Sequence, residues 1–442
     1  MQTENRVHYT IRGNKHLSGT ITVGTSKNGA MGVIAAALAN DAPTTLRHVS
    51  KIEEMFRIIE VLKSIGVETV WEGNDLTIIP PEEYALHTLD RTAAERTRTI
   101  IMFIGALIHH TSSFEIPQAG GCRLGSRTVH PHMLALEELG VSIRTTDNSW
   151  HVSHSGVHAA DIVLAESSDT ATINTLIAAA RTPGSTVIRY ASPNYQVQDV
   201  CFYLQACGVR IDGIGTTTLT VHGKRRINTP VTYELSEDPI IAMFYLACAI
   251  VTHSSITIKR APIRFLEREL CVLRTMGFHY TIKRRYKARN KQTELVDIET
   301  HPSTLRAPAD KIHATPYPGL NGDNLPFFAP IATQATGTTL IHDWMYEKRA
   351  IYLTELDKLG ASTVLADPHR IFIEGPTPLR AAELMAPPAL RPAVILIVAM
   401  LAAPGTSTLR NVYPIQRGYE DIVGALSSLG ADIEEVVETC QT

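Results

Sequence analysis

The sequence has few cysteines, no long apolar run and little net charge. None of its six cysteines forms a CxxC pair or shows the spacing of metal ligands. The longest apolar run, around residues 393–403, is shorter than a membrane span. A formal net charge of −3 argues against binding to nucleic acid through phosphate contacts. We therefore expect no metal, no membrane and no nucleic acid among the partners of this chain.

The composition is that of a globular protein, with 44% hydrophobic and 19% charged residues. A chain of 442 residues exceeds one ordinary core, which predicts two domains. Because the N-terminal segment MQTENRVHYT lacks the apolar stretch of a signal peptide, we expect a cytoplasmic protein. Cys207, Cys248 and Cys271 lie in apolar helical patterns, whereas Cys122 has a polar, glycine-rich setting.

Two interleaved patterns recur along the chain. A leucine, three further residues, a glycine and a short strand-like run appear six times, about 70 residues apart. Each copy predicts a helix that ends at a glycine and leads into a strand. The glycines are Gly66, Gly140, Gly208, Gly277, Gly360 and Gly430. An Ala-rich helix followed by a β-branched strand also occurs in six copies. Together the patterns predict an α/β protein of six similar units, three in each of two lobes.

The first two expected strands, near residues 8–11 and 20–23, precede the first copy and have no lobe of their own. We expect them to pair with the C-terminal lobe, so that the chain crosses between the lobes near residues 24–27 and 231–236. Because ligands often bind in clefts between domains, the active site is expected there. The predicted domains are lobe one, residues 1–24 plus 234–442, and lobe two, residues 25–233.

The stretch from Gly120 to Arg127 places Cys122 in a glycine-rich turn beside Arg123. Nearby positive charge stabilises a thiolate and suits an anionic substrate. The alternative is a surface turn that carries an inert cysteine.

Cations recur at turns and helix starts. Lys27 and Asn28 follow an expected strand and open an Ala-rich helix, which is a natural anion site. The spacing of a Walker A loop is absent, and a capped helix with an exposed lysine is the alternative. Together with Lys27, five arginines can clamp a carboxylate and a phosphate, although each alone is typical of a protein surface. They are Arg98, Arg127, Arg349, Arg391 and Arg417.

Two further polar segments allow more than one interpretation. Asp323 lies in a Gly/Asn-rich loop, where a carboxylate can act as general base toward a substrate hydroxyl or can merely stabilise the turn. The densest basic run, residues 283–291, is interpreted as a solvated hairpin tip, with nucleic-acid binding as the alternative.

With these motifs the chain resembles the enolpyruvyl transferases over almost its whole length, from about residue 9 to residue 435. The resemblance implies a two-lobed α/β fold of six βαβαββ units, an inside-out α/β barrel, in agreement with the count of repeats. It also implies transfer of the enolpyruvyl (carboxyvinyl) group of phosphoenolpyruvate to a hydroxyl group, with release of phosphate and without a cofactor. The branch of the family that acts on UDP-N-acetylglucosamine fits best, because the GGC loop is present.

Individual residues match family motifs. Residues 26–28 resemble the SGAKN element, whose lysine binds phosphoenolpyruvate and whose asparagine contacts the reacting centre. Residues 120–127 are similar to the loop PGGCxIGxRP, whose cysteine is implicated in proton delivery and is the target of fosfomycin. Arg127 and Arg417 match the arginines that hold the two anionic groups of phosphoenolpyruvate. Asp323 aligns with the carboxylate proposed to take the proton of the acceptor hydroxyl.

The acceptor side departs from the family pattern. Thr128 stands where the family has proline, and the segment after it reads Val129 to His132 instead of VDLH. The family stretch KVSVG is replaced by residues 166–170, which contain two acids that would repel a diphosphate. Two further family acids are replaced by Ala389 and Gln416.

The candidate residues follow from the motifs and from the resemblance. The candidate catalytic residues are Cys122, Asp323 and Lys27. The candidate phosphoenolpyruvate-binding residues are Lys27, Arg127, Arg391 and Arg417. The candidate acceptor-binding residues are Asn28, Arg98, Thr128, His132, Ser167, Ser168, Asp169, Thr170 and Arg349.

The sequence thus predicts an enolpyruvyl transferase that acts on a uridine nucleotide, with UDP-N-acetylglucosamine as the default acceptor. The altered acceptor side favours, as an alternative, a paralogue that uses UMP in nucleoside-antibiotic synthesis. A second alternative is a catalytically inactive nucleotide sensor, against which the joint presence of Lys27, Cys122, Asp323 and Arg417 argues. We expect a monomer or a weak homo-oligomer.

Overall fold

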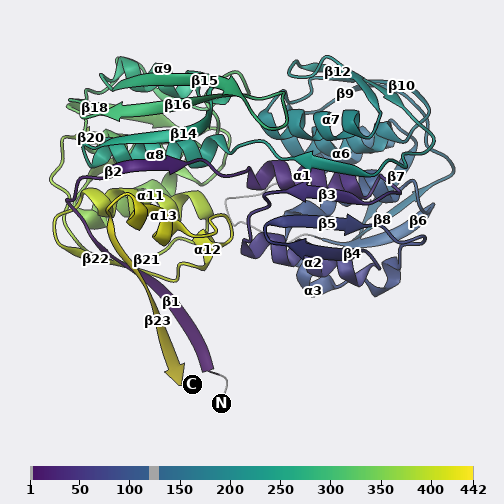
Figure 1. Ribbon diagram of the computed structural model, residues 1–442, viewed down its shortest axis with the longest axis horizontal. Coiled ribbons are helices and arrows are strands. Elements are labelled where there is room, and N and C mark those ends of the chain that lie inside the picture. Colours follow the sequence, from purple (N-terminus) through teal and green to yellow (C-terminus); the bar gives the residue numbers. More distant parts are fainter. Residues whose placement is uncertain (1–2, 119–128, 442) are drawn as a thin grey trace.

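The computed structural model describes residues 3–118 and 129–441. Figure 1 shows two lobes side by side, connected by two crossings of the chain. No helix of the described residues is long and apolar enough to cross a membrane.

Lobe two contains three sheets, with strand orders β13-β3-β5-β4, β6-β8-β7 and β11-β12-β10-β9. Its strands are β3 (Thr44–Arg47), β4 (Glu68–Glu72), β5 (Asp75–Ile79), β6 (Ser113–Pro117), β7 (Val141–Thr145), β8 (Ser149–His154), β9 (Asp161–Val163), β10 (Gly184–Arg189), β11 (Arg210–Asp212), β12 (Thr218–Gly223) and β13 (Val231–Glu234). Its helices are α1 (Lys27–Ala37), α2 (Glu53–Ser64), α3 (Arg91–Glu95), α4 (Ile104–Leu107), α5 (His130–Glu137), α6 (Asp169–Ala180) and α7 (Tyr195–Ala206), with 3₁₀ turns η1 (Leu86–Thr88) and η2 (Arg98–Phe103).

Lobe one also contains three sheets, with strand orders β15-β16-β14-β2, β17-β18-β20-β19 and β21-β22-β1-β23. Its strands are β1 (Thr3–Arg12), β2 (Ser18–Thr22), β14 (Ser255–Pro262), β15 (His279–Lys287), β16 (Glu294–His301), β17 (Ile312–His313), β18 (Gly337–His342), β19 (Ser362–Asp367), β20 (Arg370–Gly375), β21 (Glu383–Met385), β22 (Thr406–Arg410) and β23 (Asp432–Gln441). Its helices are α8 (Pro239–Val251), α9 (Glu267–Thr275), α10 (Phe328–Ala332), α11 (Leu390–Ala402), α12 (Tyr413–Gln416) and α13 (Ile422–Ser428), with 3₁₀ segments η3 (Ile263–Phe265), η4 (Leu325–Phe327) and η5 (Ala350–Leu359).

The six-unit repeat predicted from the sequence is confirmed. Each of the six glycines has a positive φ, between 84° and 95°, and lies between a helix and the next strand. This left-handed conformation is one that glycine adopts without steric penalty, which explains why the helices end there. The helix before Gly360 differs from the others because η5 is a 3₁₀ helix.

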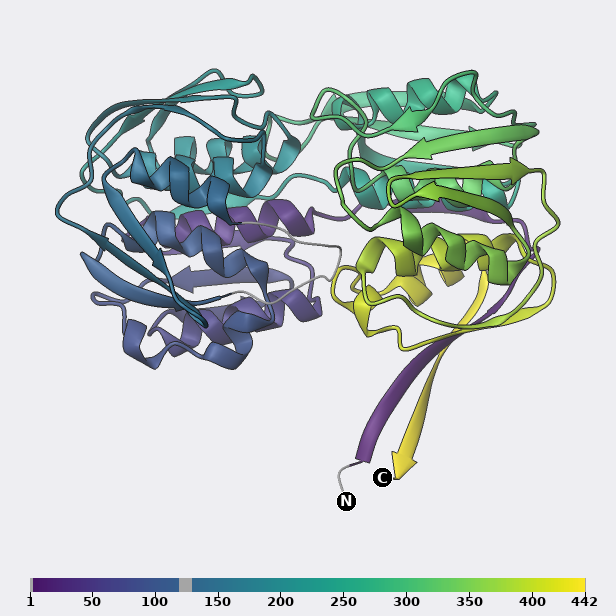
Figure 2. The same cartoon turned by 180° about the vertical axis from the view of Figure 1, so that it is seen from behind.

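The two N-terminal strands belong to lobe one, as expected. β1 pairs antiparallel with β22 and β23, and β2 pairs parallel with β14. Figures 1 and 2 show β1 and β23 as an extended ribbon whose outer end carries both termini. Lobe two is therefore a continuous segment inserted into lobe one.

Each lobe has its own hydrophobic core. The core of lobe two runs from Ala30 to Leu235, and that of lobe one combines residues 9–23 with residues 240–433. Tyr195 of α7 is the exception, because it packs with the core of lobe one. The division into domains 1–24 plus 234–442 and 25–233 stays a prediction, which the two cores support.

The two crossings lie against each other and form a seam, which we define as residues 23–26 and 235–238. Thr25 and Glu237 form an antiparallel bridge. The N–H of Ser26 donates to the carbonyl of Ser236 at 2.8 Å. Beneath the seam, buried Asp199 accepts hydrogen bonds from the hydroxyl groups of Tyr233 and Ser236, at 2.6 and 2.9 Å. One short region of backbone therefore connects the lobes.

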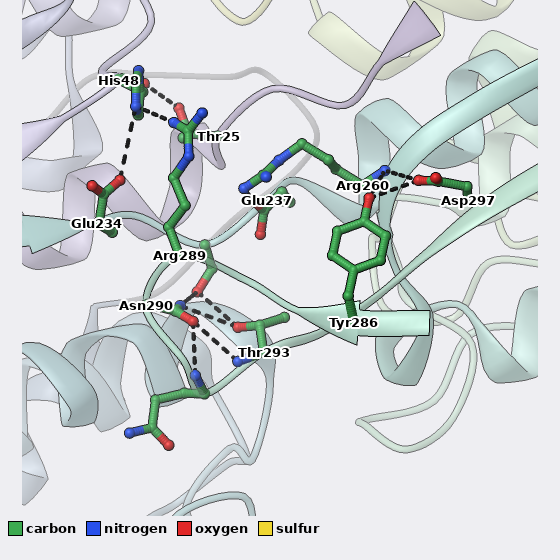
Figure 3. A network of polar contacts seen from close by, with 12 residues as sticks. Thr25, His48, Glu234, Glu237, Arg260, Tyr286, Arg289, Asn290, Thr293 and Asp297 are labelled. Atoms are coloured by element: carbon green, nitrogen blue, oxygen red, sulfur yellow. Dashed lines mark hydrogen bonds and ion pairs between the residues drawn. The ribbon is translucent and has the colours of Figure 1, made fainter. Parts of the chain in front are cut away.

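The hairpin of β15 and β16 reaches from lobe one to this seam (Figure 3). At its tip, Arg289 contacts the imidazole of His48, and Asn290 donates to the hydroxyl of Ser236 at 2.9 Å. His48 also lies 3.8 Å from a carboxylate oxygen of Glu234. The predicted hairpin is present, but the prediction of a solvated tip is wrong at Asn290, because this residue is half-buried against the seam.

Candidate active site

The N-terminus of α1 follows directly from the first crossing. The hydroxyl of Ser26 accepts the N–H of Gly29 and caps the helix, so Lys27 becomes its first residue. The ammonium group of Lys27 lies 3.3 Å from a carboxylate oxygen of Glu54. The adjacent amide of Asn28 donates to the hydroxyl of Tyr195 at 3.3 Å. The predicted anion site therefore lies beside the seam, with its lysine already held by a carboxylate.

Glu54 connects the two lobes. It lies in the first turn of α2, and the same oxygen that contacts Lys27 accepts a hydrogen bond from the guanidinium of Arg417 at 2.9 Å. Burial alone would raise the pKa of Glu54, but the charges of Lys27 and Arg417 outweigh this effect and lower it. One ionised carboxylate thus brings together a lysine of lobe two and an arginine of lobe one.

Asp323 occupies a turn of lobe one and faces several donors. One carboxylate oxygen accepts the hydroxyl of Tyr346 at 3.3 Å and lies 3.6 Å from a guanidinium nitrogen of Arg349. The other oxygen lies 3.7 Å from the guanidinium of Arg391. The side chain keeps 26% of its surface exposed. It is therefore a carboxylate that two cations hold in place and that remains accessible from solvent, so a substrate hydroxyl can reach it.

Arg391 opens α11 and is almost fully buried. It donates to the hydroxyl of Tyr419 at 3.3 Å. Burial would lower the pKa of Arg391, but the interactions with Tyr419, Asp323 and Asp238 outweigh this effect and raise the pKa above its ordinary value. The arginine therefore stays charged.

Arg349 is fully buried and binds Asp343 through two hydrogen bonds, at 2.5 and 2.9 Å. It also donates to the carbonyl of Gly322 at 2.6 Å, and its guanidinium lies 3.9 Å from the ring centre of Tyr346. Arg349, which was predicted to bind the acceptor, thus makes its contacts inside lobe one, where it supports the turn that carries Asp323.

His132 lies on α5 and is buried. The amide of Asn174 donates to its Nδ1 at 3.1 Å, so Nε2 carries the proton and donates to the hydroxyl of Thr170, also at 3.1 Å. Burial, and to a lesser degree the charge of Arg98, lowers the pKa of His132 to about 3. A neutral imidazole therefore orients the exposed hydroxyl of Thr170.

Residues 167–169 lead into α6, which begins at Asp169. The hydroxyl of Ser168 caps the helix by accepting the N–H of Ala171. Within the described residues, the hydroxyl of Ser167 is buried without a hydrogen-bond partner. Partial burial raises the pKa of Asp169, and Asp323 adds to this effect. Asp169 accepts hydrogen bonds from Ser192, Asn194 and Gln196. These three hydrogen bonds stabilise the carboxylate of Asp169 and so weaken the repulsion expected between Asp169 and a diphosphate.

Several of the predicted residues fall into three groups. Lys27 and Arg417 meet at Glu54, and Arg349 and Arg391 meet at Asp323. The candidates His132 and Thr170 are in contact, and Arg98 acts on the same imidazole. Cys122, Arg127 and Thr128 lie outside the described residues. Among the described residues, no group of three or more His, Cys, Asp or Glu side chains has the arrangement of a metal site.

The sequence interpretation missed Glu54, Tyr195 and Tyr346. Glu54 follows another glutamate at a helix start, and nothing in the local pattern shows that Glu54 is buried whereas Glu53 is only half-buried. Tyr195 contacts Asn28 and packs its ring against Phe265 of lobe one, with centroids 5.8 Å apart. The contacts of Glu54 and Tyr195 join the lobes, and the contact of Tyr346 with Asp323 lies within lobe one. All three join residues far apart in the chain, for which the sequence carries no local signal.

Comparison with known proteins agrees with this architecture. The family model for EPSP synthase (3-phosphoshikimate 1-carboxyvinyltransferase) matches residues 11–426. A UDP-N-acetylglucosamine 1-carboxyvinyltransferase from Bradyrhizobium diazoefficiens is 34% identical over 441 residues, which cover 98% of this chain and 99% of the relative. The enzyme of the same name from Treponema denticola is 31% identical over 427 residues, with 96% and 98% covered.

Two solved structures share the fold. The enolpyruvyl transferase NikO from Streptomyces tendae has a TM-score of 0.84 at 23% identity and covers 98% of this chain and 100% of its own. An EPSP synthase from Acinetobacter baumannii has a TM-score of 0.72 at 17% identity, with 98% and 100% covered. The chain therefore belongs to the EPSP synthase family of enolpyruvyl transferases and is an enzyme of this kind.

Proposed function

We propose that this enzyme transfers the enolpyruvyl group of phosphoenolpyruvate to a hydroxyl of UDP-N-acetylglucosamine and releases phosphate. The relatives that match almost the whole chain carry the name of this activity. The observation that carries the proposal is the meeting of cations from both lobes beside the seam, where Lys27 and Arg417 share Glu54. An anion with a carboxylate and a phosphate needs several fixed cations of this sort.

The proposed roles follow the chemistry of the substrates. Lys27, Arg127, Arg391 and Arg417 bind phosphoenolpyruvate. Asp323 takes the proton of the acceptor hydroxyl as its oxygen adds to C2, and Cys122 protonates C3. Loss of the C3 proton and of phosphate then restores the double bond and gives the enol ether. Enclosure between the lobes protects the intermediate from water.

The acceptor half is proposed to comprise a helix N-terminus and its surroundings. Ser167, with its buried hydroxyl, and Ser168, at the cap of α6, support an anion site at this position. The other acceptor-binding candidates are Asn28, Arg98, Thr128, His132, Asp169, Thr170 and Arg349.

UMP is the second candidate acceptor. Residues 166–170 contain no cation, and although Asp169 is bound by three donors, Glu166 is exposed. An uncompensated acid at this position is less suited to a diphosphate than to the monophosphate of UMP. This alternative corresponds to a role in nucleoside-antibiotic synthesis, whereas the first corresponds to peptidoglycan synthesis.

The test is phosphate release from phosphoenolpyruvate with UDP-N-acetylglucosamine or UMP, each over a range of concentrations. The proposal expects turnover with UDP-N-acetylglucosamine at the higher kcat/KM. A higher kcat/KM with UMP would favour the second acceptor. Absence of turnover with either, together with a Cys122 that fosfomycin leaves unmodified in mass spectrometry, would instead support an inactive nucleotide sensor.

A cytoplasmic location and a monomer or weak homo-oligomer complete the proposal. Size-exclusion chromatography with light scattering, at several protein concentrations, tests the oligomeric state.

A further inference from the structure

The turn that carries Asp323 is fixed at every residue from Asn321 to Asn324. The side chain of Asn321 accepts the N–H of Asp323 at 2.8 Å, and the carbonyl of Gly322 accepts from Arg349. The N–H of Asn324 donates to the carbonyl of Asn321 at 3.0 Å. The position of the Asp323 carboxylate therefore depends on what holds Asn321 and Asn324.

Glu269 supplies the remaining contacts. It lies in the first turn of α9, 1% of its surface is exposed, and the proposed reaction does not use it. One of its carboxyl oxygens accepts the N–H of Asn321 at 2.9 Å and the side-chain amide of Asn324 at 2.8 Å. A single buried oxygen thus binds both ends of the turn that presents Asp323.

The surroundings of Glu269 favour its neutral form. Burial raises the pKa of Glu269 to about 7, although the two donors of the turn and the charge of Arg268 oppose this rise. The carbonyl oxygen of the Asn324 amide is buried, and no described residue donates to it. Because a protonated carboxyl can donate where a carboxylate can only accept, the neutral acid can satisfy this amide as both acceptor and donor.

We propose that Glu269 is a positioning residue for enolpyruvyl transfer, which binds the Asn321–Asn324 turn in its neutral form and so places Asp323 to receive the acceptor proton. This inference rests on the proposed function, in which Asp323 is the base. It concerns a residue that touches neither substrate, so its loss alters kcat and leaves the binding of phosphoenolpyruvate intact.

Three variants test the proposal. E269Q keeps an acceptor oxygen and adds a donor, as in the neutral acid, but cannot ionise. E269L removes both functions. E267Q, two residues earlier on the exposed side of α9, is the matched control for a glutamate of the same helix turn.

Steady-state kinetics with phosphoenolpyruvate and the preferred acceptor are measured between pH 5.5 and 8.5. E269L should lose kcat by about tenfold or more, since small displacements of a catalytic group are costly, while KM for phosphoenolpyruvate changes by less than about twofold. E269Q should retain most of kcat at low pH and lack the decrease that ionisation of Glu269 causes in the unaltered protein near pH 7. E267Q should match the unaltered protein throughout.

A folded E269L with unaltered kcat, or an E269Q as impaired as E269L at every pH, would overturn the proposal. Amide hydrogen exchange of residues 320–325 provides a readout without turnover, and E269L should exchange at least about tenfold faster there than E269Q. If the unaltered protein shows no turnover, the proposed function fails. The exchange data then still decide whether Glu269 holds the turn, and equal exchange in the two variants would refute that role.

Discussion

Replacement of Glu54 by glutamine tests how the lobes are held together. At an effective dielectric constant of about 20, a carboxylate at 3.3 Å from Lys27 and 2.9 Å from Arg417 gains about 5 kcal/mol from each cation. Desolvation of Glu54 offsets much of this electrostatic gain. Solvent also screens the two cations, because the side chains of Lys27 and Arg417 are 17% and 22% exposed. We therefore expect E54Q to lower the free energy of unfolding by about 2–3 kcal/mol. This is less than the loss expected when a fully buried ion pair is broken.

The assay is thermal unfolding followed by calorimetry, with and without phosphoenolpyruvate. A loss of this size corresponds to a decrease in Tm of about 4–12 °C for a cooperative unit of some 200 residues. Phosphoenolpyruvate should raise Tm more in E54Q than in the unaltered protein, because its anionic groups then relieve the repulsion between Lys27 and Arg417. Because the pKa of Glu54 is lowered, its stabilisation is present above the ordinary value of 4.5 and is lost as pH falls below it.

The control for this experiment is E53Q. Glu53 pairs with Arg57 within α2, at 3.3 Å, and among the described residues it forms no salt bridge between the lobes. This half-buried pair of residues four apart on one helix is worth about 0.3–0.5 kcal/mol. A Tm for E54Q within about 1 °C of the unaltered protein, or an equal decrease in E53Q, would refute the conclusion that Glu54 holds the two cations together.

Three further outcomes are expected. D323N should lower kcat by about 10²–10⁴-fold in the phosphate-release assay, since the base is lost, with phosphoenolpyruvate binding by calorimetry unchanged. The raised pKa of Glu269 stabilises the folded protein at low pH, and about 3 kcal/mol of this stability is lost as pH rises from about 4.5 to about 7; urea unfolding of E269Q should lack that loss. R289A should change the free energy of unfolding by less than about 1 kcal/mol, because its contact with His48 is an exposed one.

The periodic part of the fold was predictable from the sequence. Six helices end at glycines with positive φ, and each glycine stands between a leucine-rich helix and a strand. Backbone conformation at such a residue is set locally, so the sequence carries the signal. The placement of β1 and β2 in lobe one also followed from the count of repeats, because the six copies left these strands without a partner.

The contacts of buried acids were not predictable. Glu54 and Glu269 each share the first turn of a helix with a second, more exposed glutamate, so the sequence of the turn alone does not say which one is buried. Their partners are Arg417, which is 363 residues distant, and Asn324, which is 55 residues distant. The basic hairpin was misjudged at Asn290 for the same reason, since its partner Ser236 belongs to the seam.

The seam has a mechanical consequence for any movement of the lobes. Both crossings pass through one hydrogen-bonded pair of segments, so a relative rotation that preserves these bonds has its axis there. A point on a rotating body travels in proportion to its distance from the axis. Lys27, next in the chain to the seam, would therefore shift least, whereas groups far from the seam would move furthest. An anion bound at the start of α1 would therefore be displaced little by such a rotation.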